Sequence, residues 1–125
     1  MTWLAVAVGG ALGSAARYGV NEMLLRHSTS RVFPLGVFVI NVAGCLAIGL
    51  LAGAHASGRL VVSDAMRAFM FAGILGGFTT FSSFGLDTHT LFRHGDLGAA
   101  LLNVAGQVGL GLAAVWVGFA VGGGR

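Results

Sequence analysis

Charged residues are scarce in this chain. Only 9% of its 125 residues are charged, comprising seven arginines and four acids, and lysine is absent. A water-soluble domain carries about 25% charged residues because its surface faces water, so this composition excludes an ordinary soluble domain. The arginines stand singly along the chain, and the net charge of +3 therefore forms no basic patch for a nucleic acid.

Cysteine and the usual catalytic constellations are also lacking. The single cysteine, Cys45, excludes an intrachain disulfide framework, and its place in an apolar run is typical of a packing residue. The chain shows no nucleophile–base pair, carboxylate pair or phosphate-binding loop, and we therefore expect no enzymatic activity. The histidines lie near the ends of apolar segments without metal-like spacing: His27, His55, His89 and His94.

What the chain does contain is apolar residues, at 56%, and 22 glycines. A membrane helix needs about 20 largely apolar residues, and glycine lets such helices approach closely. Four segments qualify, at about 2–25, 34–55, 63–92 and 97–121. The sequence thus predicts an all-α membrane protein, a single four-helix transmembrane domain over 1–125. No positive residue precedes the first segment, which favours a membrane helix over a signal peptide.

The arginines predict no preferred orientation in the membrane. With four spans, the two termini and the connection at 57–62 lie on one side. Three arginines lie near each side: Arg59, Arg67 and Arg125 on one, Arg26, Arg31 and Arg93 on the other. The positive-inside rule then gives almost no bias, which favours insertion in both orientations and permits an antiparallel dimer. The alternative is that another signal sets one orientation.

Polar side chains within the spans are costly in hydrocarbon and are therefore candidates for an ion path or for packing. Asn41 is the strongly polar residue of the second span. Asn103 and Gln107 stand four residues apart in the last span and hence share a helix face. The third span carries the longest polar stretch.

That stretch predicts a helix broken near 76–79 in the middle of the membrane. Gly76-Gly77 favours the break, and the pair Thr79-Thr80 is suited to cap a restarting helix. A broken helix leaves carbonyls and amides that lipid cannot satisfy, so they are buried in protein or line a cavity. Bare carbonyls suit a cation and helix N-termini suit an anion.

Beyond the break, Phe81 and Phe84 stand three apart on one face. The edge of a phenyl ring is electropositive, so two aligned edges can contact an anion without a full charge. Thr80 and Ser83 place hydroxyl donors beside them. The alternative interpretation is that the rings pack against neighbours or lipid and the hydroxyls bond their own helix.

The segment Gly76-Gly-Phe-Thr-Thr-Phe-Ser-Ser-Phe84 resembles the signature of the Fluc (CrcB-type) fluoride channels. Gly9-Gly-Ala-Leu-Gly-Ser-Ala-Ala-Arg17, Asn41-Val-Ala-Gly44 and the glycine-rich last span agree with that family in order and spacing, so the resemblance covers essentially the whole chain. It implies an antiparallel, dual-topology homodimer in the bacterial plasma membrane (the inner membrane). Two fluoride pores along the subunit interface would export cytoplasmic fluoride passively.

The resemblance also implies roles for single residues. Phe81 and Phe84 correspond to the pair whose ring edges contact fluoride, Asn41 to a pore-lining hydrogen-bond donor, and Thr80 and Ser83 to a line of polar groups. The resemblance further implies that backbone carbonyls of Gly76 and Thr79 hold a structural Na⁺ at the dimer centre, that Arg17 lies at a pore vestibule, and that Asp87 replaces a longer Glu. Asn103 and Gln107 correspond to pore residues on the same line of polar groups, where the family often has Ser or Thr.

Two other functions stay open from the sequence. A small dual-topology, proton-coupled multidrug exporter needs a central carboxylate in its first span. Glu22 is the acid of that span, near its end, and we expect it to pair with Arg17 or Arg26. A non-conducting assembly subunit would leave Phe81 and Phe84 as packing residues. The balanced arginine count also permits a heterodimer with a homologous chain.

Overall fold

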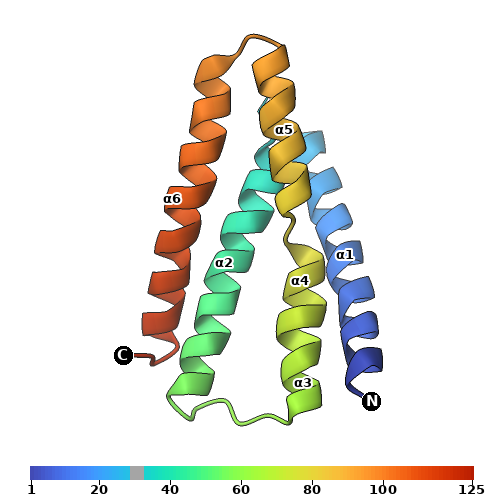
Figure 1. Cartoon of the computed structure of the whole chain (residues 1–125), viewed down its shortest axis with the longest axis vertical. Coiled ribbons are helices and arrows are strands. Elements are labelled where there is room, and N and C mark those ends of the chain that lie inside the picture. Colours follow the sequence, from blue (N-terminus) through green and yellow to red (C-terminus); the bar gives the residue numbers. More distant parts are fainter. Residues whose placement is uncertain (29–32) are drawn as a thin grey trace.

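The computed structural model describes residues 1–28 and 33–125, and these ranges contain helices and no β-strand. The helices lie side by side as antiparallel rods (Figure 1). Three rods are single helices, α1 (Thr2–His27), α2 (Leu35–Ala56) and α6 (Leu97–Val121). The remaining rod is third in chain order, and we call it the third rod. It consists of α3 (Asp64–Ala68), the π-helix η1 (Phe69–Leu75), α4 (Gly76–Phe78) and α5 (Phe81–Arg93).

Three segments of the described residues are long and apolar enough to cross a membrane: Leu35–Ala56, Asp64–Arg93 and Leu97–Val121. The protein is therefore a multi-pass membrane protein. The sequence predicted a fourth span at 2–25. α1 has sufficient length at 26 residues, but it carries Arg17 and Glu22, which dilute its apolar character.

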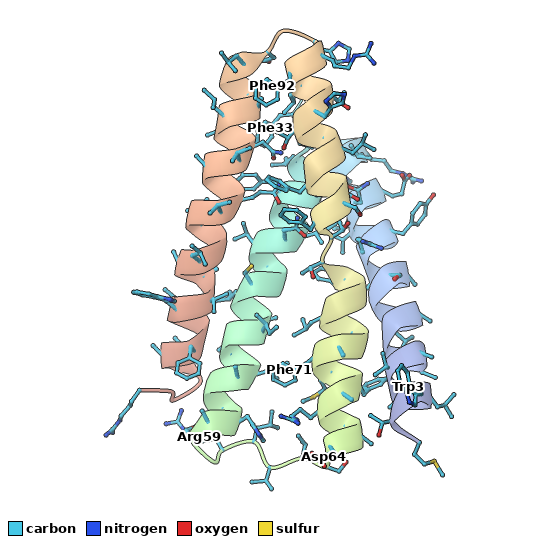
Figure 2. All side chains as sticks on the ribbon, in the orientation of Figure 1. Trp3, Phe33, Arg59, Asp64, Phe71 and Phe92 are labelled. Carbon is cyan, nitrogen blue, oxygen red and sulfur yellow. The ribbon has the colours of Figure 1, made fainter. Side chains whose placement is uncertain are left out.

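Both chain termini lie at the same end of the molecule, together with the connection between α2 and α3 (Figure 1). Arg59 and Asp64 lie at this end, and Trp3 lies close to it on α1 (Figure 2). The sequence predicted that the two termini and the connection at 57–62 share one side, and they lie at the same end of the molecule (Figure 1). Arg31, which entered the arginine count, lies outside the described residues.

Glycines bring α2 and α6 into direct backbone contact. A Cβ at Gly49 or Gly53 of α2 would overlap carbonyl oxygens of α6. In return, a Cβ at Gly118 or Gly122 of α6 would overlap carbonyl oxygens of α2. The close approach of helices expected from the many glycines is therefore confirmed for α2 and α6.

α1 packs against the third rod in the same manner. A Cβ at Gly9 would lie 2.6 Å from the carbonyl oxygen of Phe69, and one at Gly13 would overlap the carbonyl oxygen of Ile74. From the other side, a Cβ at Gly77 would lie 2.5 Å from the carbonyl oxygen of Gly10. Gly77 therefore serves close packing against α1.

The helix break lies further along the chain than the sequence predicted. Gly76–Phe78 is helical, and the backbone becomes extended at Thr79 (ψ 159°) and Thr80 (φ −153°, ψ 117°). Figure 1 shows the ribbon losing its coil between α4 and α5. Gly76 and Gly77 are helical, contrary to the prediction, and Thr79 is the residue of the predicted interval 76–79 that lies in the break. The π-helix that precedes the break, Phe69–Leu75, had no signal in the sequence.

Candidate functional site

The side chain of Asn41 holds the break between α4 and α5 open. Its Oδ1 accepts the Thr80 N–H at 2.9 Å, and its Nδ2 donates to the Thr80 carbonyl oxygen at 3.0 Å. In a continuous helix the Thr80 N–H would bond to the carbonyl of Gly76. Asn41, on α2, thus takes the place of helical hydrogen bonds at the break.

Thr80 also caps the helix that restarts. Its Oγ1 accepts the Ser83 N–H at 3.2 Å and donates to Ser83 Oγ at 3.1 Å. Ser82 Oγ lies 3.2 Å from the same hydroxyl. The predicted cap at the Thr-Thr pair is confirmed, and it gathers hydroxyl groups at the N-terminus of α5, where the helix dipole is positive.

The two rings expected to share a face do so. The ring centroids of Phe81 and Phe84 are 5.3 Å apart, with the planes tilted by 48°. The Phe81 side chain is 83% exposed, although it follows directly on the buried Thr80. Phe81 is the first residue of α5, and its ring, like other exposed apolar side chains of this membrane protein, is available to lipid or to a partner.

A hollow of about 360 Å³ lies beside these rings. Asn41, Thr80 and Gln107 provide its polar wall, and Phe71, Phe81 and Phe84 contribute aromatic rings. Phe71 projects from η1 toward α2 (Figure 2). The hollow is open on one side, so it is an apolar recess with a polar strip rather than an enclosed cavity.

A second hollow, of about 300 Å³, lies on the other side of the break and shares Thr80 with the first. It contains Arg17, whose Nη1 donates to the Thr79 carbonyl oxygen at 3.4 Å, and Ser83. Its other polar lining residues were missed from the sequence: Ser14, Tyr18 and Asn21. These residues are spaced three or four apart and share one face of α1 with Arg17. That spacing could have identified them from the sequence.

The two amides of the last span differ in their placement. Gln107 lines the first hollow, whereas Asn103 is completely buried and lines neither hollow. Gln107 Nε2 donates to Asn103 Oδ1 at 2.9 Å. Nearby on α5, the Oδ2 atom of Asp87 is buried without a hydrogen-bond partner among residues 1–28 and 33–125.

The backbone at the break offers carbonyl oxygens suited to a hard cation. The helical partner of the Gly76 carbonyl, the Thr80 N–H, is used by Asn41. The helical partner of the Thr79 carbonyl, the Ser83 N–H, is used by the Thr80 hydroxyl. The Gly76 oxygen thereby loses its helical partner, and the Thr79 oxygen accepts from Arg17 and keeps one lone pair, as carbonyls do in the unwound segments that coordinate Na⁺ in transporters. One chain supplies too few ligands for a complete shell, so the donor set fits a cation only when a second copy adds its own.

Glu22 does not form the predicted ion pair with Arg17 or Arg26. Within the described ranges, the ion pair is that between Asp64 and Arg67, at 3.9 Å and exposed. The Arg17 guanidinium instead donates a hydrogen bond from α1 to the Thr79 carbonyl oxygen at the break. In those ranges, no cluster of His, Cys, Asp and Glu side chains is arranged to hold a metal.

Comparison with known proteins gives a consistent family. The family model described as "CrcB-like protein, Camphor Resistance (CrcB)" matches residues 4–119. A protein of Paracoccus denitrificans named "Fluoride-specific ion channel FluC" is 53% identical over 123 residues, 97% of this chain and 94% of that protein. The FluC of Methylobacillus flagellatus is 47% identical over 114 residues, 91% of this chain and 88% of its own length.

A third relative, "Fluoride-specific ion channel FluC 1" of Symbiobacterium thermophilum, is 43% identical over 125 residues and the full length of both chains. These relatives are named as ion channels and not as enzymes, and this chain is likewise not an enzyme. The match over nearly the whole length shows that the chain belongs to the CrcB family.

Proposed function

We propose that this chain forms a passive, fluoride-selective channel through which cytoplasmic fluoride leaves a bacterial cell. The observation that carries the proposal is the Phe81–Phe84 ring pair beside an interrupted helix whose N-terminus gathers hydroxyl groups. Relatives with up to 53% identity carry the name of a fluoride-specific ion channel.

The chemistry of the site suits fluoride. Fluoride is small and strongly hydrated, so a pore replaces its water with donors yet binds weakly enough for release. The ring edges of Phe81 and Phe84 offer weak positive charge. Thr80 donates its hydroxyl hydrogen to Ser83 Oγ, so the hydroxyl hydrogen of Ser83 is the one that can turn to the ion. Asn41 adds a polar amide to the wall of the first hollow. None of these groups carries a full charge that would trap the ion.

We place the break near the middle of the membrane. Thr79 and Thr80 lie about halfway along the apolar segment Asp64–Arg93, and α1 completes a set of four crossings. At that depth the unpaired backbone must line a protein cavity rather than face lipid. Two observations support this position: Thr80 is buried, and it borders both hollows.

A second copy of the chain completes the pore in this proposal. The exposed Phe81 ring and the open side of the first hollow lack a cover in the single chain. The equal numbers of arginines at the two sides support insertion in both orientations. We infer an antiparallel, dual-topology homodimer in the plasma membrane, with two pores along the subunit interface. The arginine count also permits the same antiparallel arrangement in a heterodimer with a homologous chain.

Arg17 and the freed carbonyls have electrostatic roles in the proposal. The Arg17 guanidinium makes the second hollow a positive vestibule that raises the local concentration of anions. The carbonyl oxygens of Gly76 and Thr79 from both copies hold the structural Na⁺, which supplies fixed positive charge at the dimer centre when bound. The hydrogen bond from Arg17 to Thr79 keeps the carbonyl-bearing segment in its extended form.

The proton-coupled multidrug exporter has less support. Such an exporter needs a carboxylate at the centre of its first span. Glu22 lies near the end of α1 instead, six residues before the C-cap residue Ser28. A non-conducting assembly subunit would also present an exposed Phe81 to a partner, so the names of the relatives, fluoride-specific ion channels, are what favours conduction.

The test is anion efflux from liposomes that contain the purified protein, with fluoride and chloride assayed in parallel. The proposal predicts rapid fluoride efflux without chloride efflux and without any requirement for a proton gradient. Equal passage of chloride would overturn it, as would transport of organic cations driven by a proton gradient.

A further inference from the structure

Side-chain amides of α2 and α6 form a continuous hydrogen-bonded chain. Three amide-to-neighbour contacts make up its centre, and each is between 2.7 and 3.0 Å long. We call this set the amide chain. Its links run from Asn41 Nδ2 to Gln107 Oε1, from Gln107 Nε2 to Asn103 Oδ1, and from Asn103 Nδ2 to Thr88 Oγ1.

Both ends of the amide chain attach to the first turn of α5. At one end, the Thr80 N–H donates to Asn41 Oδ1 at 2.9 Å. At the other end, Thr88 Oγ1 donates to the Phe84 carbonyl oxygen at 2.7 Å. The turn between these two backbone groups carries the rings of Phe81 and Phe84. The amide chain thus leaves this turn at its start, passes through α2 and α6, and returns to its end.

The backbone groups at the two ends fix the direction of every link. The Thr80 N–H can only donate and the Phe84 carbonyl can only accept, so each amide between them must accept on one side and donate on the other. Turning one amide over would set donor against donor at one junction and acceptor against acceptor at the next. The bond between Gln107 and Asn103 is buried, so water does not compete for it.

We propose that Gln107 and Asn103 are positioning residues, which fix the orientation of the ring-bearing turn through Asn41 and Thr88. Their hydrogen-bonding groups serve the amide chain rather than the permeating ion, and Asn103 lines neither hollow. This inference rests on the proposed function for its effect on flux, while the effect on ring orientation stands independently of it.

Two substitutions of Gln107 separate positioning from direct contact with the ion. Gln107→Met keeps the length of the side chain and removes its hydrogen bonds. Gln107→Ser keeps a hydroxyl donor in the first hollow but is too short to bridge Asn41 and Asn103. If Gln107 acts by positioning, both variants lose fluoride flux by about tenfold, the factor that one lost hydrogen bond of ordinary strength represents. Leu110→Met, at an exposed position on the same helix, is the matched control and leaves flux unchanged.

Ring orientation is read separately from flux. A single 4-fluorophenylalanine placed at position 84 of the full-length protein gives a ¹⁹F NMR signal from that ring. The inference predicts one narrow line in the parent and the control, and a shifted or split line in Gln107→Met and Gln107→Ser. Unchanged ¹⁹F lines in both variants would overturn the inference, as would wild-type fluoride flux in Gln107→Ser. Absence of fluoride flux in the parent overturns the proposed function, and the ¹⁹F comparison still decides the positioning role.

Discussion

Asn41 and Thr80 pair as two strands of a sheet would, although one partner is a side chain. The amide oxygen of Asn41 accepts the Thr80 N–H at 2.9 Å, and its nitrogen donates to the Thr80 carbonyl at 3.0 Å. This pairing joins α2 to the one extended stretch between α4 and α5. The break is therefore a bonded structural feature, maintained from outside its own helix.

Replacing Asn41 by Ala should destabilise the fold and remove transport. The change removes the Asn41 partner of the Thr80 N–H, of the Thr80 carbonyl oxygen and of Gln107 Oε1, and each unsatisfied buried group costs about 1–3 kcal/mol. The free energy of unfolding in detergent measures the loss, and fluoride efflux measures the function. Thr90→Ala removes an exposed hydroxyl that bonds to its own helix, so it should change stability by less than about 0.5 kcal/mol. An Asn41→Ala protein as stable as Thr90→Ala would contradict the account of the break.

Phe81→Ile should suppress fluoride efflux while leaving assembly intact. Isoleucine preserves an apolar side chain at this exposed position but has no ring edge for the anion. Phe92→Ile is the control, because Phe92 lies on the same helix and is 49% exposed at the far end. Efflux from liposomes and the oligomeric state in detergent are compared for both. Unchanged flux in Phe81→Ile would remove the ring-edge mechanism.

Gly13→Ala should separate α1 from the third rod. A Cβ there would overlap the Ile74 carbonyl oxygen and lie 2.9 Å from the Phe78 nitrogen, and overpacking costs about 1–3 kcal/mol. Gly19→Ala is the matched control on the same helix, because a Cβ there meets nothing within 4 Å. That control should gain up to about 1 kcal/mol, since alanine loses less backbone entropy than glycine. Equal unfolding free energies for the two variants would contradict the observed helix contact.

Shifting arginines between the two membrane sides should force a single orientation. Val61→Arg with Arg93→Gln biases the chain one way, and His94→Arg with Arg125→Gln biases it the other way. Either double variant alone should lose fluoride resistance in cells, because it cannot form an antiparallel pair. Co-expression should restore it. Full resistance from one double variant alone, with labelling from one side of the membrane only, would contradict dual topology.

The general architecture followed from composition and helix length. The last span matched the structure at 97–121, since Asp96 caps it and apolar residues fill it. The Thr80 cap was likewise predictable, because Ser and Thr favour N-cap positions and the fold does not override that preference here. The first helix was predicted at about 2–25, and α1 runs over Thr2–His27. Arg17 and Glu22 make it less apolar than the three segments that are apolar enough to cross a membrane.

The position of the break and the amide chain could not be predicted from local sequence. Gly76-Gly77 resembles a break because glycine disfavours helices, but both residues are helical and Gly77 lies close to Gly10 of α1. The pairing of Asn41 with Gln107 joins residues 66 positions apart, and only the packing of α2 on α6 brings them together. Sequence spacing does not encode such a contact.

The most direct test of fluoride selectivity is the reversal potential of the current in a planar bilayer. With a tenfold gradient of fluoride and equal chloride on both sides, the account predicts reversal about 59 mV from zero, at the equilibrium potential of fluoride. Reversal at zero under that gradient, or reversal that follows an imposed chloride gradient, would contradict it.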